Sequence, residues 1–240
     1  MAYMASVAKT CDAVVTGGDG FRWEGRIATA IGKHELIGEM RKLHFQRVIS
    51  GVIGAIQVES IVKKDPVEGE AKGLQLFYKT MIDNGLGEKS RMFEFALKHV
   101  KKHQIEVVQE FLAEIRVPIY MVTRGGSTGA EAAVKAFPQI QIRNFVSQQD
   151  VFSPSGKLKG VNITMPNRKA EVAVVEEMLA KDNIKLSNCM VADDSNIQLL
   201  RRGKISVTHE GTDKEIRDAC GIVLTVPSRK MPWAGIGKAK

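Results

Sequence analysis

The chain has 240 residues, of which 44% are hydrophobic and 26% are charged, and its formal net charge is +8. This balance excludes a disordered chain, and no run of about 18 apolar residues is long enough for a membrane helix. The three widely spaced cysteines form neither a metal-binding pair nor a disulfide ladder. Together with a start that lacks a signal-peptide pattern, they lead us to expect a reducing, cytoplasmic setting.

The first predicted element is a buried strand over residues 13–16, and a tight glycine-rich loop, Gly17-Gly18-Asp19-Gly20, follows it. From residue 22 to about residue 104, strand-like runs become scarce and apolar residues recur at helical spacing. We therefore predict a helical cap inserted over residues 22–104. The core would comprise residues 10–21 and 105–227, and a basic tail would follow over residues 228–240.

Beyond the predicted insertion, strands and helices alternate along the chain. This alternation favours an α/β fold with a Rossmann-like, three-layer core, in which a parallel sheet is covered on both faces. In such sheets, ligands bind at the carboxyl ends of the strands. The predicted helices cover residues 106–115, 128–137, 170–182 (with Asn167 as cap) and 197–202, and the strands cover 117–122, a hairpin of 144–151 and 160–165, 187–192, 205–208 and 222–226.

Polar residues follow several of these strands and can be assigned chemical roles. Attack on a phosphomonoester brings an anionic nucleophile to a dianion, so a cation, hydroxyl or amide donors and often a metal ion must neutralise the charge. Lys169 can supply the cation and Thr123 a hydroxyl donor. Asp193 and Asp194 offer the carboxylate oxygens that Mg²⁺ prefers. Asp19 could protonate a leaving alkoxide.

In order and spacing these residues resemble the four signature motifs of the haloacid dehalogenase superfamily, and most closely its phosphoserine-phosphatase-like branch. The motifs stand here as VVTGGDGF, IYMVTRGG, NRKAEV and MVADDSNIQLL, and residues 152–160, FSPSGKLKG, resemble a further segment of that branch. The resemblance implies a small phosphorylated molecule as ligand. It places Asp19 at the acid/base position, phosphate binding on Thr123, Arg124, Gly125 and Lys169, and a metal on Asp193, Asp194 and the backbone carbonyl of Asp19.

The sequence departs from this pattern at three positions. Gly17 stands where the family has its nucleophilic aspartate, and Ile197 stands where a second acidic residue of the last motif is expected. We therefore expect magnesium to bind weakly or not at all, and the covalent route to be closed. Arg26 replaces the glutamate that holds the substrate amine in phosphoserine phosphatases. With Arg22 and Lys33 it would favour an anionic ligand if the cap faces the cleft.

Three hypotheses follow from the sequence. The first is a catalytically impaired protein that binds a phosphate-bearing ligand or partner. The second is an active metal-dependent phosphomonoesterase with a rearranged site, because four of the expected site residues are retained. The third, based on charge alone, is a protein associated with nucleic acid or ribonucleoprotein. Each residue also has an ordinary structural interpretation: Thr123, Asp193 and Asp194 as helix caps, and Lys169 as a surface lysine.

Overall fold

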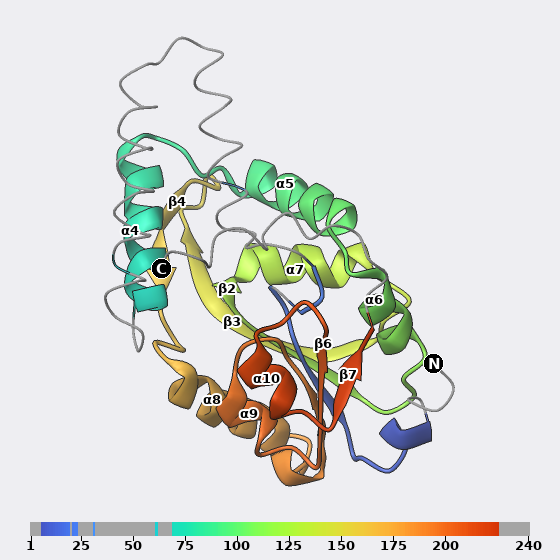
Figure 1. The fold of residues 1–240 in the computed structure, drawn as a ribbon. Helices are drawn as coiled ribbons and strands as arrows, with labels where there is room; N and C mark the ends of the chain where they lie inside the picture. The colour runs from blue at the N-terminus through green and yellow to red at the C-terminus, as the bar shows by residue number, and fades with distance from the viewer. Residues whose placement is uncertain (1–5, 20, 24–30, 32–60, 62–68, 226–240) are drawn as a thin grey trace, which may run out of the picture.

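The computed structural model describes residues 6–19, 21–23, 31, 61 and 69–225. Within these ranges the chain follows the α/β alternation predicted from the sequence (Figure 1). In chain order the elements are β1 (Val14–Gly17), α4 (Gly69–Asp83), α5 (Lys89–Lys102), α6 (Glu106–Ala113), β2 (Ile119–Gly126), α7 (Ser127–Ala136), β3 (Ile142–Phe152), β4 (Leu158–Asn162), α8 (Arg168–Ala180), the 3-10 turn η1 (Leu186–Asn188), β5 (Met190–Ala192), α9 (Ile197–Leu200), β6 (Ile205–His209), α10 (Lys214–Asp218) and β7 (Ile222–Leu224).

The described strands form one sheet in the order β4-β3-β2-β1-β5-β6-β7. Only β4 runs antiparallel to its neighbour, and the remaining described pairs are parallel. β1 lies between β2 and β5, and all four of its residues are buried. The predicted α/β class with a mostly parallel sheet is therefore confirmed.

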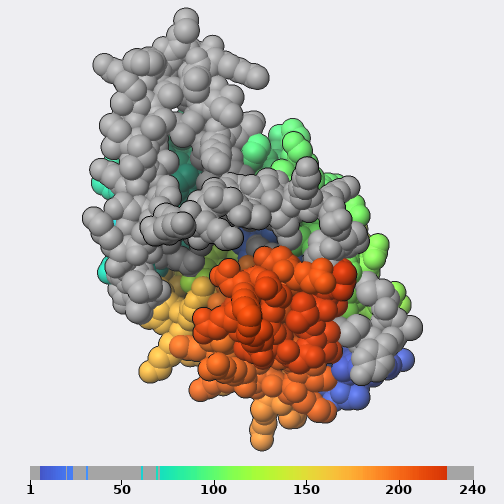
Figure 2. Space-filling model, in the orientation of Figure 1, coloured from blue at the N-terminus to red at the C-terminus, as the bar shows by residue number. Residues whose placement is uncertain are grey.

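Alternating residues of β1 point into two separate cores. Val14 packs with apolar side chains of α5, α6 and α7 on one face of the sheet. Val15 packs with side chains of α8, α9 and α10 on the other face. The result is the expected three-layer arrangement, which Figure 1 shows with the sheet between the two sets of helices. In the same orientation, Figure 2 shows the C-terminal segments, coloured orange to red, as one continuous surface.

Within the range predicted to be an insertion, the structure describes two long helices. α4 lies along β4, whereas α5 buries Met92, Ala96 and Val100 and packs against α7. Residues 24–30, 32–60 and 62–68 lie outside the described residues, as does the predicted tail over residues 228–240. The boundaries of the insertion therefore stay a prediction. No helix in the described part of the chain is long and apolar enough to cross a membrane.

Several local predictions can be compared with the structure. The hairpin forms as β3 and β4, and Asn167 caps α8 by accepting a hydrogen bond from the Ala170 amide at 2.9 Å. The strand predicted over residues 187–192 is shorter, because Leu186–Asn188 turns as η1 before β5 begins. α10 was not predicted, since its five residues are too few for a helical period to show in the sequence.

Candidate functional site

The carboxyl ends of β2, β1 and β5 lie next to one another in the sheet, and the three corresponding motifs are found there. Gly17 ends β1, Thr123 lies within the last part of β2, and Asp193 directly follows β5. Parallel strands end at the same edge of a sheet. Gly17 and Asp193 therefore come together, although 176 positions separate them along the chain.

Gly17 is packed tightly against the carboxylate of Asp193. A Cβ atom on residue 17 would lie 2.4 Å from Asp193 Oδ2 and 3.2 Å from its Cγ. The Asp193 side chain cannot easily move aside, because its Oδ1 accepts hydrogen bonds from the Ser195 and Asn196 amides, each at 2.7 Å. The carboxylate of Asp193 therefore occupies the space through which a side chain at position 17 would leave the backbone.

Asp19, Thr123 and the neighbouring glycines form the other half of this edge. A Cβ on Gly125 would meet Asp19 Oδ2 at 3.1 Å and Thr123 Oγ1 at 3.3 Å, and a Cβ on Gly18 would meet Thr123 Cβ at 2.9 Å. Thr123 is buried, and its Oγ1 accepts a hydrogen bond from the Gly125 amide at 3.1 Å. Asp19 Oδ1 accepts from Trp23 Nε1 at 2.8 Å. The structure thus brings Asp19 and Thr123 together across two glycines.

Asp194 is held beside Asp193 at the start of the loop. Burial raises the pKa of Asp194 well above its usual value, and the nearby charges of Asp193 and Asp19 raise it further. The next residue in the expected pattern, Ile197, begins α9 and packs against the core beneath α8. Asn196 caps α9 by accepting a hydrogen bond from the Leu199 amide at 3.2 Å. The cap of α9 is therefore Asn196, and not Asp193 or Asp194 as the structural interpretation of the sequence had it.

The start of α8 contributes two basic residues with different surroundings. Lys169 is exposed. Arg168 is half-buried, and its backbone carbonyl accepts a hydrogen bond from Asn196 Nδ2 at 3.3 Å. Its charge lowers the pKa of both Asp194 and Glu171, so its guanidinium lies close to those carboxyls. The structure therefore brings Arg168 to the strand ends and leaves its neighbour at the surface.

Glu171, one helical turn further along α8, was not identified from the sequence. It is buried, and its Oε2 lies 3.3 Å from Arg124 Nε. Burial raises the pKa of Glu171 to about 7, and the charge of Asp193 adds to this shift, whereas Arg124 and Arg168 oppose it. An acidic residue three positions after Arg168 could have been noticed, but a glutamate in the first turn of a helix is common and carries no specific signal.

Tyr78 of α4 also reaches this part of the molecule and was missed by sequence reasoning. Its hydroxyl donates to Asp150 Oδ1 at 2.7 Å, and Asp150 Oδ2 accepts from the Thr128 amide at 2.8 Å. Gly126 permits the contact, because a Cβ there would lie 2.2 Å from both the Tyr78 hydroxyl and the Asp150 carboxylate. Burial raises the pKa of Tyr78 well above its usual value, with Asp150 and Asp19 adding to the shift.

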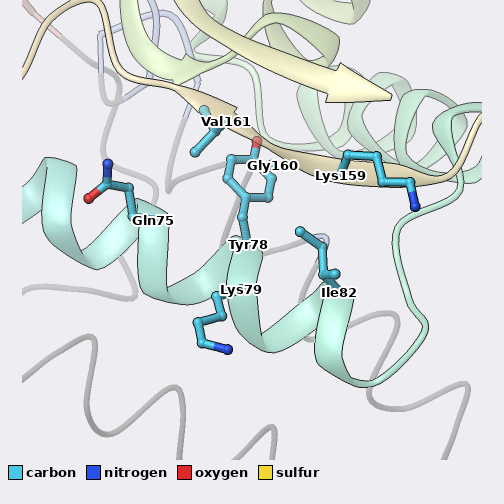
Figure 3. Close-up of a pocket in the computed structure, with 7 residues that line it drawn as sticks. All are labelled: Gln75, Tyr78, Lys79, Ile82, Lys159, Gly160 and Val161. Carbon is cyan, nitrogen blue, oxygen red and sulfur yellow. The ribbon is translucent and has the colours of Figure 1, made fainter. Parts of the chain in front are cut away.

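Behind Tyr78 lies the hollow shown in Figure 3, between α4 and β4. It has a volume of about 400 Å³ and is lined by Gln75, Tyr78, Lys79, Ile82, Lys159, Gly160 and Val161. Lys79 is already paired with Asp83 at 2.7 Å. None of the strand-end residues lines this hollow, so it is separate from the edge formed by β1, β2 and β5.

Of the basic residues expected to face a ligand from the insertion, Arg26 and Lys33 lie outside the described residues. Arg22 is described, and it is fully buried. Its guanidinium donates to Gln109 Oε1 and contacts Met121 Sδ, both at 3.2 Å, and it lies over the rings of Trp23 and Phe137. Burial lowers its pKa to about 10. The expectation that Arg22 faces an anionic ligand is therefore wrong, because the side chain turns into the core.

The donor set at the strand ends does not fit a magnesium site of the expected kind. Position 17 provides no side chain, and Asp193 Oδ1 is engaged by two amides. Within the described ranges, no three His, Cys, Asp or Glu side chains are grouped so that they could hold a metal ion.

Comparison with solved structures gives the fold a family context. A phosphoserine phosphatase solved as a phospho-aspartyl intermediate analogue aligns with a TM-score of 0.60 and 11% identity, over 90% of this chain and 93% of that one. A HAD family hydrolase from Salmonella enterica serovar Typhi gives 0.59 and 10%, over 89% and 68%. Cytosolic 5′-nucleotidase IIIB bound to cytidine gives 0.59 and 14%, over 93% and 83%.

The chain has the fold of the haloacid dehalogenase-like phosphatases. No family model and no curated protein matches its sequence. At 10–14% identity the likeness to these solved structures concerns the fold, and the roles of individual residues must come from the site itself.

Proposed function

We propose that the protein binds a phosphate-bearing small molecule or partner at the carboxyl ends of β1, β2 and β5 and hydrolyses phosphomonoesters little or not at all. The observation that carries this proposal is the contact between Gly17 and Asp193. The attacking carboxylate is missing at position 17. The space that a side chain there would need is also occupied by Asp193, since a Cβ at position 17 would lie 2.4 Å from Asp193 Oδ2. A site that retained room for a nucleophile would leave this space open.

The chemistry of phosphoryl transfer explains why this loss matters. A covalent nucleophile divides a difficult displacement into two easier steps, and without it only direct attack by water remains. Asp19 could still accept or donate a proton there, but it is held by Trp23, and the donor set beside it does not fit a magnesium ion. By analogy with hydrolases that lose a catalytic group, about 10³–10⁴-fold acceleration over water is the most we expect to remain.

Binding of an anion is supported by polar groups that the protein itself leaves unpaired. Two donors near this edge, Arg168 Nη1 and Thr128 Oγ1, are buried and have no hydrogen-bond partner. An unpaired buried donor costs about 1–3 kcal/mol, so a ligand that accepts from such a group gains that energy back. Thr123 adds a hydroxyl whose proton is not used by its contact with the Gly125 amide.

The first test measures hydrolysis of p-nitrophenyl phosphate with Mg²⁺, Mn²⁺ and Co²⁺. We expect no metal-dependent turnover by the wild type beyond a trace. Gly17→Asp should restore at most a trace, because its Cβ meets Asp193 Oδ2, and adding Ile197→Asp would disturb the packing beneath α8. Strong metal-dependent turnover by the wild type that is lost in Asp19→Asn would contradict the proposal and establish an active phosphomonoesterase with a rearranged site.

The second test measures binding directly, by calorimetric titration with inorganic phosphate in a chloride buffer. The proposal requires saturable binding with one site per chain, and absence of binding would contradict it. Nucleic-acid association stays a separate prediction from charge. It would show as retention on a single-stranded RNA homopolymer that falls steeply as salt rises.

A further inference from the structure

We infer that Arg168, and not its neighbour Lys169, is the cation that contacts the phosphate group at the strand ends. The inference rests on the proposed function, because it concerns the same site. It changes the assignment made from sequence, where Lys169 was the natural choice for a single positive charge before a helix. The two cations differ in how the first turn of α8 directs them and in which of them has a buried donor without a partner.

Three contacts set the orientation of the α8 start. Asn167 caps the helix through the Ala170 amide, and the carbonyl of Arg168 accepts a hydrogen bond from Asn196 Nδ2. Asn196 is itself fixed, since its amide donates to Asp193 Oδ1 at 2.7 Å. Arg168 is thereby joined through one residue to the loop that follows β5. Successive residues of a helix point about 100° apart, so Lys169 is directed elsewhere, and it is exposed.

The guanidinium of Arg168 is close to carboxylates without being paired to one. Its charge affects the pKa of Asp194 and Glu171, yet none of the ion pairs formed among the described residues includes Arg168. Its Nη1 is buried and lacks a hydrogen-bond partner. The other arginine at this edge, Arg124, is engaged by Glu171 at 3.3 Å. Of these two arginines, Arg168 is therefore the one with a buried donor that has no partner.

Two features of the position of Arg168 are unfavourable for stability, although its charge stabilises the nearby carboxylates of Asp194 and Glu171. Arg168 is the first residue of α8, where the helix dipole disfavours a positive charge. A buried donor without a partner adds a further cost. Both costs disappear when an anion lies against the guanidinium, and the two-pronged geometry of this group matches two oxygens of a phosphate. This is the chemistry of a binding residue for a tetrahedral oxyanion.

The experiment compares Arg168→Gln with Lys169→Gln, a matched control one residue away that removes the same charge. Inorganic phosphate is titrated into each variant and into the wild type by calorimetry, and urea unfolding checks that each variant is folded. We expect Arg168→Gln to weaken phosphate binding about tenfold or more, and Lys169→Gln to change it by less than about twofold. Arg168→Lys, which keeps the charge but loses the fork, should fall between wild type and Arg168→Gln.

Each other outcome has a definite meaning. If the wild type binds phosphate and Lys169→Gln weakens binding as much as or more than Arg168→Gln, the inference is wrong while the proposed function stands. The same holds if neither variant changes the affinity. If the wild type binds no phosphate, the proposed function fails and the inference falls with it. If Arg168→Gln does not fold, the comparison of Arg168→Lys with Lys169→Gln decides in the same way.

Discussion

The two edges of the parallel sheet differ in how fully their polar groups are paired. At the amino edge, the hydroxyl of Tyr120 donates to Asp182, and Arg143 Nη2 lies 3.3 Å from the other oxygen of that carboxylate. Asn188 donates to Asp12 at 2.9 Å in the same region. These charges and donors of the amino edge meet partners within the chain.

The carboxyl edge is arranged differently. Buried atoms without a hydrogen-bond partner include Thr128 Oγ1, Arg168 Nη1 and Glu171 Oε2, and the last lies near Arg124 without the geometry of a hydrogen bond. Glycines at this edge leave no room for a Cβ. Unpaired polar groups and close approaches reduce stability, and proteins retain them mainly where another molecule completes the site. The contrast supports the proposed binding edge without reference to any motif.

The largest expected change in the free energy of unfolding comes from adding a Cβ at Gly17, the crowded position of the carboxyl edge. Gly17→Ala should lower the free energy of unfolding by about 1–3 kcal/mol, because the added Cβ would lie 2.4 Å from an Asp193 oxygen held by two amides. Gly160→Ala is the control, since a Cβ there meets nothing within 4 Å. Its stability should stay within about 0.5 kcal/mol of wild type or rise slightly. Urea unfolding measures both, and equal losses would show that crowding at Gly17 is not the cause.

A smaller effect is expected at the amino edge. Tyr120→Phe removes the donor to Asp182 and should lower the free energy of unfolding by about 1 kcal/mol, because that carboxylate keeps access to water.

The same pair predicts a dependence on pH. Hydrogen bonds from Tyr120 and Arg143 lower the pKa of Asp182 in the folded protein. The stability from Asp182 is thus present above its unfolded-state pKa, about 4, and is lost as pH falls through the lower folded pKa. Urea midpoints measured from pH 6 down to pH 2.5 should fall less steeply in Tyr120→Phe than in wild type. Parallel curves would show that the pair does not carry this dependence.

How much of this could be predicted from sequence depends on the kind of contact. The α/β class and the meeting of the β1, β2 and β5 loops follow from alternating elements and the geometry of a parallel sheet, and need no side-chain detail. The choice between Arg168 and Lys169 could not be made from the sequence, because it depends on the orientation of the α8 start, to which the tertiary hydrogen bond from Asn196 contributes. Two adjacent cations look alike in a sequence.

Other features were hidden for related reasons. The filling of the space beside Gly17 depends on the rotamer of Asp193, which two amides of the following loop select. Arg22 was expected to favour an anionic ligand, yet it is buried between aromatic rings and Gln109. In each case the orientation of the side chain is set by a residue far away in the sequence or by backbone amides. The identity of the residue itself does not reveal such a contact.

The smallest effect has the opposite sign and tests the unpaired Thr128 hydroxyl against a paired hydroxyl at the end of β6. Thr128→Val replaces a buried hydroxyl that has no partner by a methyl group of the same shape, and it leaves the amide that donates to Asp150 intact. Removing an unpaired buried polar group should raise the free energy of unfolding by about 0.5–1 kcal/mol. Thr208→Val is the matched control, because the Thr208 hydroxyl is equally buried but contacts Thr212 Oγ1 at 3.2 Å, and its loss should lower stability by a similar amount. Urea unfolding of the two variants beside the wild type gives both signs in one experiment. If Thr128→Val lost stability as Thr208→Val does, the hydroxyl would have a partner in solution, and the contrast between the two edges would have to be redrawn without it.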